Sequence, residues 1–417
     1  MTSVDIHIDS VYHRLPCRVG AFGYDMSLGK TSYRWEYDQD WLREHRQVTL
    51  SADLLNVTGP QYANNHIFGL LQDTMPDRWG RNLIKKRERL LAEQQGRSPK
   101  HLNDVDYLLQ IDDSTRMGAL RFEQDGKLVG NEYAEMKVPP ITYLRKFVDM
   151  AHEYELQEQQ GGEVREEWLF NLYRQGSSLG GARPKANVRD TDGSLWIAKI
   201  PSINDDYDVA LWEYWAHQLA AKAGIKVPQM KLLRLDGTRY HTLLSKRFDR
   251  QGENRIHFAS AMTLTGLHDG ADATTGNGYM DIVDTIITNT GFVDPQDALK
   301  QLYRRVAYYI AIGNHDDHFR NHGFLLTDNG WVWSPAYDIN PADYDTQSLL
   351  ISKYTNDSSL PALMDAAEEY MLSSEVASKI INEVVNAVSQ WHVVAAQCGI
   401  SPTEQKRFAA RIKTGIR

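Results

Sequence analysis

The sequence has few cysteines and no long apolar run. Only two of the 417 residues are cysteines, Cys17 and Cys398, which lie near opposite ends of the chain and exclude a disulfide framework or a cysteine-rich zinc site. No stretch approaches the roughly 18 uncharged apolar residues that a membrane-spanning helix needs. The start, Met1 to Ser10, lacks a basic patch followed by an apolar run. We therefore expect a cytoplasmic protein with no membrane partner.

An excess of basic residues is absent as well. The chain carries 46 Lys and Arg against 55 Asp and Glu, which gives a net charge of −9. The surface as a whole therefore repels polyanions and offers no general reason to bind nucleic acid directly. Hydrophobic residues at 42% and charged residues at 24% are the balance of a folded globular chain. A chain of this length predicts two or more packed units.

Hydrophobic periodicity suggests how the chain is organised. Alternating apolar residues predict a small sheet with strands at 5–8, 17–24 and 32–37, and a separate strand is predicted at 118–122. A helical period predicts one helix over 67–75 and a second that runs through Leu83 and stops before Gly96. We assign residues 1–137 to an N-terminal α/β subdomain.

The pattern changes after the Val138-Pro139-Pro140 segment. A helix is expected over 142–158, followed by strands at 185–188 and 195–200, a helix at 208–223, and strands at 229–235 and 240–246. A sheet with one helix is typical of a nucleotide-binding small lobe, which we assign to 138–250. The remainder, 251–417, reads as a mainly helical large lobe, apart from a dense polar segment at 313–345. The expected fold class is α+β.

The first cluster that could carry chemistry is a loop of small residues at 177–185. Glycine lets backbone N–H groups approach phosphate oxygens, and a nearby cation adds charge stabilisation. The candidates for nucleotide binding are Ser178, Gly180, Gly181, Ala182, Arg183 and Lys185. Taken alone the loop matches neither G-x-G-x-x-G nor the Walker pattern, and a flexible turn explains it better.

Lys199 strengthens the nucleotide interpretation. It lies in the apolar strand 195–200, where a buried lysine is costly unless it is paired, and Glu213 on the following helix is a ready partner. A strand lysine held by a helix glutamate is a known way to grip nucleotide phosphates. The alternative is a lysine on an edge strand that points to water.

The second cluster, at 314–322, follows directly after an apolar helix in the sequence and contains two acids, three histidines, an arginine and two asparagines. Asp316 and Asn321 are five residues apart, the separation between a base and a metal ligand in one type of phosphoryl-transfer loop. His318 and Arg320 are further candidates for nucleotide contact. Two alternatives stay open: a solvated loop, and a zinc hydrolase site that uses the histidines and acids of 315–322.

The third cluster follows a predicted hairpin, 324–326 against 331–333, around an Asp-Asn-Gly turn. The hairpin would project Asp338 toward the second cluster, 22 residues after Asp316. An acid in that position can bind the metal that bridges the β- and γ-phosphates. The alternative is an aspartate that caps a turn before Pro341.

With these clusters, the chain resembles a family, the HipA-like serine/threonine kinases of bacterial toxin–antitoxin modules. The likeness covers nearly the whole length and rests on the motifs Leu71 to Gly80, Met117 to Phe122, Ser177 to Lys185, Lys246 to Arg250, Asn314 to Asn321 and Tyr337-Asp338. It implies a two-lobed, protein-kinase-like fold and an enzyme that uses ATP and Mg²⁺.

The resemblance also implies roles for individual residues. Asp316 looks like the catalytic acid, Lys199 like the phosphate lysine, and Asn321 and Asp338 like the Mg²⁺ ligands. The strand 243–247, with Leu244 and Lys246, would lie beside adenine. Ser178 matches a loop serine that such kinases autophosphorylate, which would give an off switch.

Partners follow from the same resemblance. Family members are commonly neutralised by a small helix-turn-helix antitoxin, so nucleic acid would be reached only through that antitoxin. Some members phosphorylate an aminoacyl-tRNA synthetase, so such an enzyme or another translation component is the implied substrate. The competing hypotheses are the metal-dependent hydrolase centred on 315–322 and a catalytically inactive, kinase-like binding protein.

Overall fold

The computed structural model describes residues 2–12, 17–27, 30–63, 66–130, 138–162, 165–176, 181, 183–289, 291–342 and 345–415. It divides into two compact units. The first comprises residues 1–210 and 230–258, and the second comprises 211–229 and 259–417. The boundary expected at residue 137 lies inside the first unit and stays a prediction.

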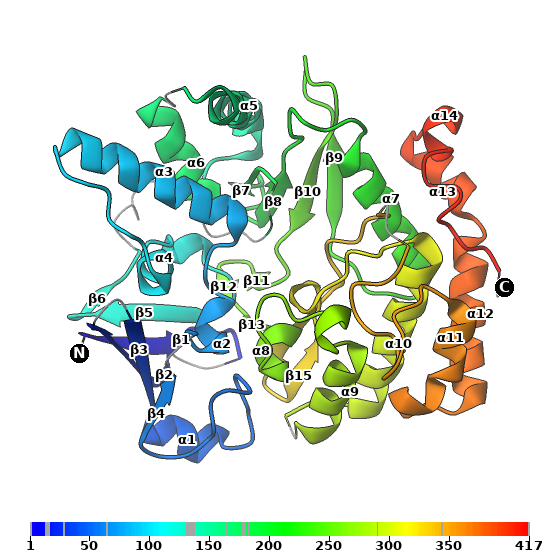
Figure 1. Ribbon diagram of the computed structural model, residues 1–417, viewed down its shortest axis with the longest axis horizontal. Coiled ribbons are helices and arrows are strands. Elements are labelled where there is room, and N and C mark those ends of the chain that lie inside the picture. Colours follow the sequence, from blue (N-terminus) through cyan, green and yellow to red (C-terminus); the bar gives the residue numbers. More distant parts are fainter. Residues whose placement is uncertain are drawn as a thin grey trace. The chain divides into compact units, whose positions relative to one another are not determined.

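The first unit begins with a sheet that the sequence predicted in outline. Six of the described strands form it in the order β4-β3-β2-β1-β5-β6, and all their pairings are antiparallel (Figure 1). The strands are β1 (Thr2–Ile8), β2 (Cys17–Ser27), β3 (Lys30–Tyr37), β4 (Pro60–Ala63), β5 (Leu120–Gln124) and β6 (Lys127–Leu128). The side chains of Val4, Ile6 and Ile8 alternate along β1 and are fully buried, which confirms the expected period of two.

Helices of the first unit pack on these strands and on a second sheet. They are α1 (Gln39–His45), α2 (Gly69–Gln72), α3 (Arg78–Gln94), α4 (Asp104–Leu109), α5 (Leu144–Gln160) and α6 (Glu166–Gly176). The helix predicted over 67–75 was largely wrong, because only the single turn α2 forms there. Pro76 cannot extend that turn, and Asp77 instead caps the long helix α3 with its side chain. The helix expected over 142–158 is confirmed as α5, which ends at Gly161 with a φ of 70°.

The second sheet of the first unit has the order β7-β8-β10-β9. Its strands are β7 (Lys185–Arg189), β8 (Leu195–Lys199), β9 (Met230–Leu233) and β10 (Thr242–Lys246). β8 has a paired neighbour on each side. Lys199 is therefore not on an edge strand, and that alternative was wrong. A short hairpin, β11 (Arg250–Gln251) with β12 (Asn254–Arg255), follows β10.

A buried ion network ties the two sheets of the first unit together. Asp249 is completely buried and accepts hydrogen bonds from Gly118 N (2.8 Å), from Arg247 Nε and Nη2 (both 2.6 Å) and from Arg250 Nη1 (2.6 Å). Burial alone would raise the pKa of Asp249, but the two guanidinium groups hold it well below its ordinary value. Gly118 precedes β5 and Asp249 follows β10, so this single carboxylate joins segments 131 residues apart in sequence.

The second unit is mainly helical, as expected. Its helices are α7 (Val209–Lys222), which starts in the first unit, and then α8 (Ala261–Thr265), α9 (Tyr279–Thr288), α10 (Pro295–Ile312), α11 (Leu360–Asp365), α12 (Ser374–Val388), α13 (Trp391–Cys398) and α14 (Pro402–Gln405). α10 is buried along much of its length and packs against α12 (Figure 1). The Tyr308 hydroxyl donates to Ala216 O of α7 at 2.5 Å, which fixes α7 against α10.

A three-stranded sheet of order β13-β14-β15 completes the second unit. It is built from β13 (His257–Ser260), which carries the chain into this unit, β14 (Gly323–Thr327) and β15 (Gly330–Trp333). The predicted hairpin is confirmed, with Leu326 opposite Trp331 and Thr327 opposite Gly330. Within the described residues, no helix combines the length and apolar character needed to cross a bilayer.

Candidate active site

The polar loop 314–322 follows directly after α10. The helix ends at Gly313, whose φ of 72° is in the left-handed region that favours glycine. Two adjacent acids in the loop then have opposite environments: Asp316 is exposed, whereas only 1% of Asp317 is exposed. An exposed carboxylate can meet a substrate, and a buried one must be held by donors. The loop therefore separates a solvent-facing acid from a structural one.

Asp317 is the centre of a buried hydrogen-bond network. Its Oδ2 accepts from the Tyr279 hydroxyl at 2.7 Å and from His322 Nε2 at 2.6 Å, and both donors are fully buried. Burial, together with the neighbouring Asp317 carboxylate, raises the pKa of Tyr279 well above its ordinary value. Tyr279 opens α9, so this network joins the two ends of the segment 317–322 to each other and holds Asp317 against a neighbouring helix.

Asn321 lies within this anchored segment. Its side chain is 5% exposed, and its Nδ2 donates to the backbone oxygen of Asp316 at 3.4 Å. With the amide nitrogen used in this way, the Oδ1 atom is the end of the side chain that remains for a cation. The predicted base and the predicted metal ligand are thus linked directly within one loop.

The segment that carries Asp338 contacts the same loop on both sides of Asp316. The Tyr337 hydroxyl donates to Arg320 O at 2.5 Å, and Asn340 N donates to Asn314 Oδ1 at 3.2 Å. Asp338 lies between these two contacts and has a φ of 56°, a conformation that aspartate and asparagine tolerate better than most residues. The second unit therefore brings the three residues predicted at the reacting phosphate into one region.

The two other candidates of this loop have different surroundings. Arg320 makes a bidentate ion pair with Asp269, with Nε to Oδ1 at 2.7 Å and Nη2 to Oδ2 at 2.9 Å. Asp269 itself is largely exposed. An anionic ligand would have to compete with that carboxylate for the guanidinium group. His318 is half-buried at the start of the short helical turn Phe319–Asn321.

In the first unit, the structure gathers three of the predicted phosphate contacts. Lys185 of β7 lies directly opposite Lys199 of β8. Opposite residues of an antiparallel pair share one face, where two like charges are unfavourable unless an anion lies near them. Gly181 has a φ of 86°, and a Cβ atom at this position would collide with Lys185 Nζ. The glycine thus allows the loop to lie against the lysine ammonium.

Asp77 holds the same loop from another helix. Its Oδ2 accepts from Gly181 N at 2.7 Å, while Trp79 N donates to Gly181 O at 3.1 Å. Both residues belong to the N-terminal end of α3. Gly181 is therefore fixed through its two backbone polar groups, which positions the end of the loop that leads into β7.

The remaining candidates are placed as follows. Ser178, Gly180 and Ala182 lie outside the described residues. Arg183 is ion-paired with Asp205 (2.7 Å), and the Lys246 ammonium lies 5.9 Å from the centre of the Trp196 ring. The side chain of Leu244 belongs to the apolar core of the four-stranded sheet. Glu213 is buried in α7, and because it is in the second unit its pairing with Lys199 stays a prediction.

The zinc alternative finds no support in the geometry. Among the described residues, no group of three or more His, Cys, Asp or Glu side chains is arranged to hold a metal ion. His322 is engaged with Asp317, and His315 Nε2 lies 3.0 Å from Ser358 Oγ. Burial, with the charges of Lys413 and Arg411, lowers the pKa of His315. Histidines that already contact separate partners do not form a tetrahedral site.

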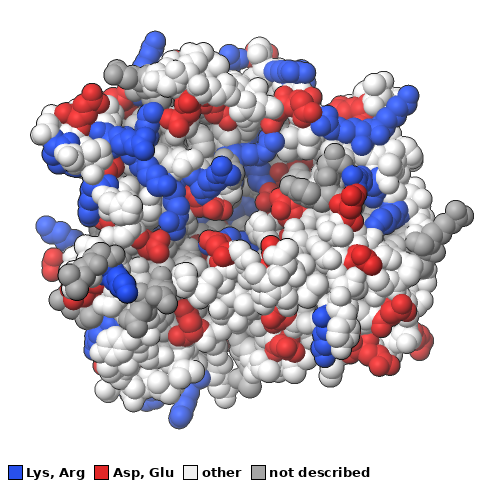
Figure 2. All heavy atoms as spheres, in the orientation of Figure 1, with Lys and Arg blue, Asp and Glu red and all other residues white. Residues whose placement is uncertain are grey.

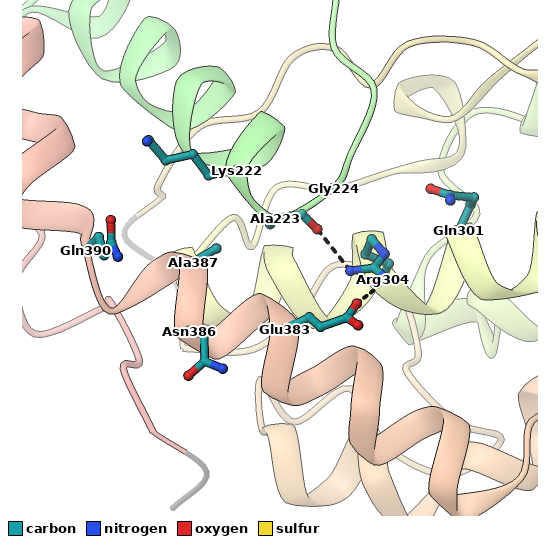
Figure 3. Close-up of a pocket in the computed structure, with 9 residues that line it drawn as sticks. All are labelled: Lys222, Ala223, Gly224, Gln301, Arg304, Glu383, Asn386, Ala387 and Gln390. Atoms are coloured by element: carbon teal, nitrogen blue, oxygen red, sulfur yellow. Dashed lines mark hydrogen bonds and ion pairs between the residues drawn. The ribbon is translucent and has the colours of Figure 1, made fainter.

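A separate groove of about 690 Å³ lies in the second unit (Figure 3). Arg304 of α10 forms part of its wall and donates to Ala223 O (3.0 Å) and to Glu383 Oε2 of α12 (2.6 Å). This arginine therefore joins the end of α7 to α10 and α12. The lining residues that Figure 3 labels, all within the described chain, include none of the predicted nucleotide contacts.

Two family descriptions match the chain. The HipA-like C-terminal domain matches residues 177–392, more than half of the chain, and the HipA N-terminal domain matches residues 17–123. The chain belongs to the HipA family. This confirms the resemblance that the motifs suggested.

Individual relatives show how far the likeness extends. The Serine/threonine-protein kinase toxin HipA of Shewanella oneidensis is 24% identical over 189 residues, which are 40% of this chain and 43% of that protein. The alignment therefore spans less than half of that relative. A chain in the solved complex of HipA, HipB and operator DNA from Shewanella oneidensis MR-1 matches with a TM-score of 0.68 at 17% identity, over 98% of this chain and 94% of that chain. This likeness confirms the expected α+β fold.

A lower structural similarity was found to the Helicobacter pylori proinflammatory kinase CtkA. It has a TM-score of 0.35 at 14% identity, over 51% of this chain and 94% of that one.

Several residues of this HipA-family chain have positions that sequence reasoning did not foresee. Asp77, Gly118 and Asp249 belong to motifs that carry the family likeness, yet no role followed from their spacing. The structure shows that they connect segments far apart in sequence. Tyr279 was missed altogether, since a tyrosine opening an apolar helix looks like an ordinary core residue. Asp317 and His322 were visible in the loop, but only burial distinguishes them from Asp316.

Proposed function

We propose that this HipA-family chain is an ATP-dependent serine/threonine protein kinase. The observation that carries the proposal is the contact of the Tyr337–Asn340 segment with the loop 314–322. It brings a solvent-facing carboxylate, a second carboxylate and an amide oxygen to one region of the second unit. Phosphoryl transfer needs such a set, because it depends on positioning and on charge stabilisation rather than on a protein nucleophile.

Asp316 is the residue we assign to the attacking hydroxyl. Its exposed carboxylate orients the serine or threonine side chain and accepts the proton as the hydroxyl oxygen bonds to the γ-phosphorus. The bond from phosphorus to the β–γ bridging oxygen breaks at the same stage, and ADP leaves. The hydrogen bonds of the neighbouring Asp317 hold the backbone at Asp316 in place, so that the carboxylate of Asp316 needs little reorganisation at the moment of transfer.

Asn321 and Asp338 are the residues we assign to Mg²⁺. Carboxylate and amide oxygens are ligands that this ion prefers, and an amide adds no competing negative charge. The Oδ1 atom of Asn340, two residues after Asp338, is buried with no hydrogen-bond partner among the described residues, which suits an oxygen beside a hydrated cation. When bound, Mg²⁺ would offset the negative charge that develops on the β- and γ-phosphates.

The first unit supplies the phosphate-binding side of the proposal. Lys185 and Lys199 face the same side of their sheet, and Gly181 allows the loop to lie against the Lys185 ammonium. We assign these residues to the nucleotide phosphates, and the strand containing Leu244 and Lys246 to adenine. Ser178 is the proposed site of autophosphorylation, where a dianionic phosphate would repel the nucleotide phosphates.

The biological setting is proposed from relatives. The matched Shewanella structure contains HipA together with HipB and operator DNA, and the curated relative is named a toxin. We therefore propose that this chain is the toxin of a toxin–antitoxin pair, works in the cytoplasm and is neutralised by a small DNA-binding partner. Its target would be a serine or threonine of a translation component such as an aminoacyl-tRNA synthetase.

The direct test is incorporation of label from γ-labelled ATP with Mg²⁺ present. Wild-type protein should label itself or a supplied protein, and Asp316→Asn and Asp338→Asn should each lower the rate by about 100-fold or more. Asp328→Asn, at the exposed tip of the β14–β15 hairpin, is the matched control and should label normally. Full labelling by Asp316→Asn, or none by the wild type, would contradict the proposal.

A further inference from the structure

The outer face of α3 has a charge pattern that the proposed kinase activity does not use. Arg78, Asn82, Lys85 and Arg89 are all exposed and follow one another at intervals of four, three and four residues. Those intervals place their side chains in one line along the helix. We call these four residues the α3 stripe. From Arg78 to Arg89 the stripe extends for about 16 Å, at roughly 1.5 Å per residue.

The charged residues that flank the stripe are already paired. Arg81 contacts Asp104 at 3.2 Å, Lys86 contacts Glu158 at 2.7 Å, and Glu88 contacts Arg97 at 2.6 Å. Hydrogen bonds from Arg97 and from the backbone of Lys100 lower the pKa of Glu88 to about 2, so this acid is ionised and its charge is compensated. Arg87 is half-buried, with its guanidinium 4.7 Å from the centre of the Tyr173 ring, and adds a positive charge. The flanks of the stripe therefore contribute no net negative charge.

The three cations of the stripe itself have no such compensation. Within the described part of the chain, the side chains of Arg78, Lys85 and Arg89 make no ion pair or hydrogen bond. The next exposed acid along the helix is Glu93, beyond the end of the stripe. Figure 2 shows Lys and Arg atoms gathered along α3. A local positive strip thus exists on a chain whose net charge is −9.

We propose that the α3 stripe binds the phosphate backbone of a nucleic acid. A row of long cationic side chains separated only by an asparagine suits a polymer that presents negative charges at regular intervals. The core of a protein–protein interface is usually depleted of lysine and centred on aromatic or apolar anchors. The stripe has no such anchor, so a nucleic acid fits it better than an acidic protein.

The family resemblance implied that nucleic acid would be reached only through an antitoxin, and the net charge of −9 gave no general reason for direct binding, because it averages over the whole surface. The three ion pairs that flank the stripe cancel locally, however, and leave cations that the average hides. The contact would be with phosphates and independent of base sequence. It does not depend on phosphoryl transfer, so Asp316→Asn should bind nucleic acid like the wild type.

The test is anisotropy of labelled nucleic acid titrated with the full-length protein. A DNA duplex and an RNA duplex of about 20 base pairs distinguish the two sources of phosphate, and a polyglutamate competitor represents an acidic protein. Three phosphate contacts predict a slope of about −2.7 for log K against log salt on DNA, at about −0.9 per contact, which is a roughly 40-fold loss between about 50 and 200 mM salt.

The variant set separates the stripe from general charge. Replacing the three cations of the stripe together by glutamine (Arg78→Gln, Lys85→Gln, Arg89→Gln) should flatten the salt dependence and weaken binding at low salt by at least about tenfold. The control removes three exposed cations elsewhere in the first unit (Lys30→Gln, Arg46→Gln, Lys127→Gln) and should bind like the wild type.

Thermal unfolding confirms that both triple variants are folded. No binding by the wild type, or equal binding by the two triple variants, would overturn the inference. So would polyglutamate that displaces nucleic acid at equal charge concentration, since the stripe would then be a docking site for an acidic protein.

Discussion

Asp316 and Asp317 are neighbours in sequence with the same side chain, yet replacing each by asparagine should have opposite consequences. Asp317 receives two hydrogen bonds, from Tyr279 and His322, in a fully buried site. A bond to a charged group contributes about 1.5–3 kcal/mol. Both hydrogen bonds end on Oδ2, so an asparagine oxygen in that place can accept both, but only as a neutral acceptor, for which each bond contributes about 0.5–1.5 kcal/mol. The loss is about 1–1.5 kcal/mol per bond, and release from the cost of burying a charge offsets part of it, so Asp317→Asn should destabilise the protein by roughly 2 kcal/mol.

Asp316→Asn should change the free energy of unfolding by no more than about 0.5 kcal/mol, because the side chain is exposed and makes no hydrogen bond among the described residues. It should nevertheless abolish phosphoryl transfer. The assay is urea denaturation followed by tryptophan fluorescence, run beside label transfer from ATP. At temperatures where both variants remain folded, Asp317→Asn should keep part of its nucleotide affinity, since the predicted phosphate lysines lie elsewhere in the chain.

The two variants test separate features of the loop. If Asp317→Asn is as stable as the wild type, the buried network does not hold the loop. If Asp316→Asn costs as much stability as Asp317→Asn, the exposed carboxylate has a structural role, and its assignment to the attacking hydroxyl loses its basis.

Three further predictions follow from the geometry. Asp249→Asn leaves two buried arginines without their carboxylate and should cost about 3–5 kcal/mol, against a much smaller loss for Asp149→Asn, whose ion pair is exposed. Because the folded pKa of Asp249 is depressed, its stabilisation is fully present above the unfolded value near about 3.9 and is lost as pH falls through the folded pKa, so the wild-type advantage in urea should shrink in acid. Gly181→Ala and Gly193→Ala place alanine at similar positive φ angles of 86° and 84° and should lose similar stability, but only the former meets a lysine ammonium, so only it should weaken ATP binding in a titration. Asp338→Asn should keep the wild-type stability, because asparagine accepts a φ of 56°, while transfer should require more Mg²⁺; an unchanged Mg²⁺ requirement would argue against Asp338 as a ligand.

The sequence predicted much of the fold where local patterns decide structure. The four strands of the second sheet, α5, α7 and the β14–β15 hairpin all appear within a few residues of their expected bounds. These elements combine a clear period with turn residues at both ends. The prediction of a helix over 67–75 was wrong because the helical period there is short. The chain forms β4 before this segment, makes the single turn α2 within it, and reaches Pro76 directly after it.

What could not be predicted is which distant segments meet. Gly118 contacts Asp249, and Gly181 contacts Asp77, across more than 100 residues in each case. No spacing rule in a single sequence encodes such contacts. Lys199 illustrates the same limit, since its strand could be an edge or an interior strand until the pairing of β10 with β8 is known. The high density of polar residues in 314–322 indicated where the candidate site lies. The pairing of distant segments determines which residues can lie there together.

The loop 314–322 shows why a motif alone does not assign roles. Its polar residues fall into two groups by burial: Asp317 and His322 bond inward, while Asp316 faces solvent. The two groups depend on each other, because an exposed acid can orient a hydroxyl only if its backbone is held still, and a buried acid costs free energy without donors. A chain under selection for phosphoryl transfer would therefore keep both groups. A chain that only binds a partner would keep the buried network for stability but would have no need for an exposed carboxylate held beside it, so Asp316 favours the catalytic interpretation over an inactive binding protein.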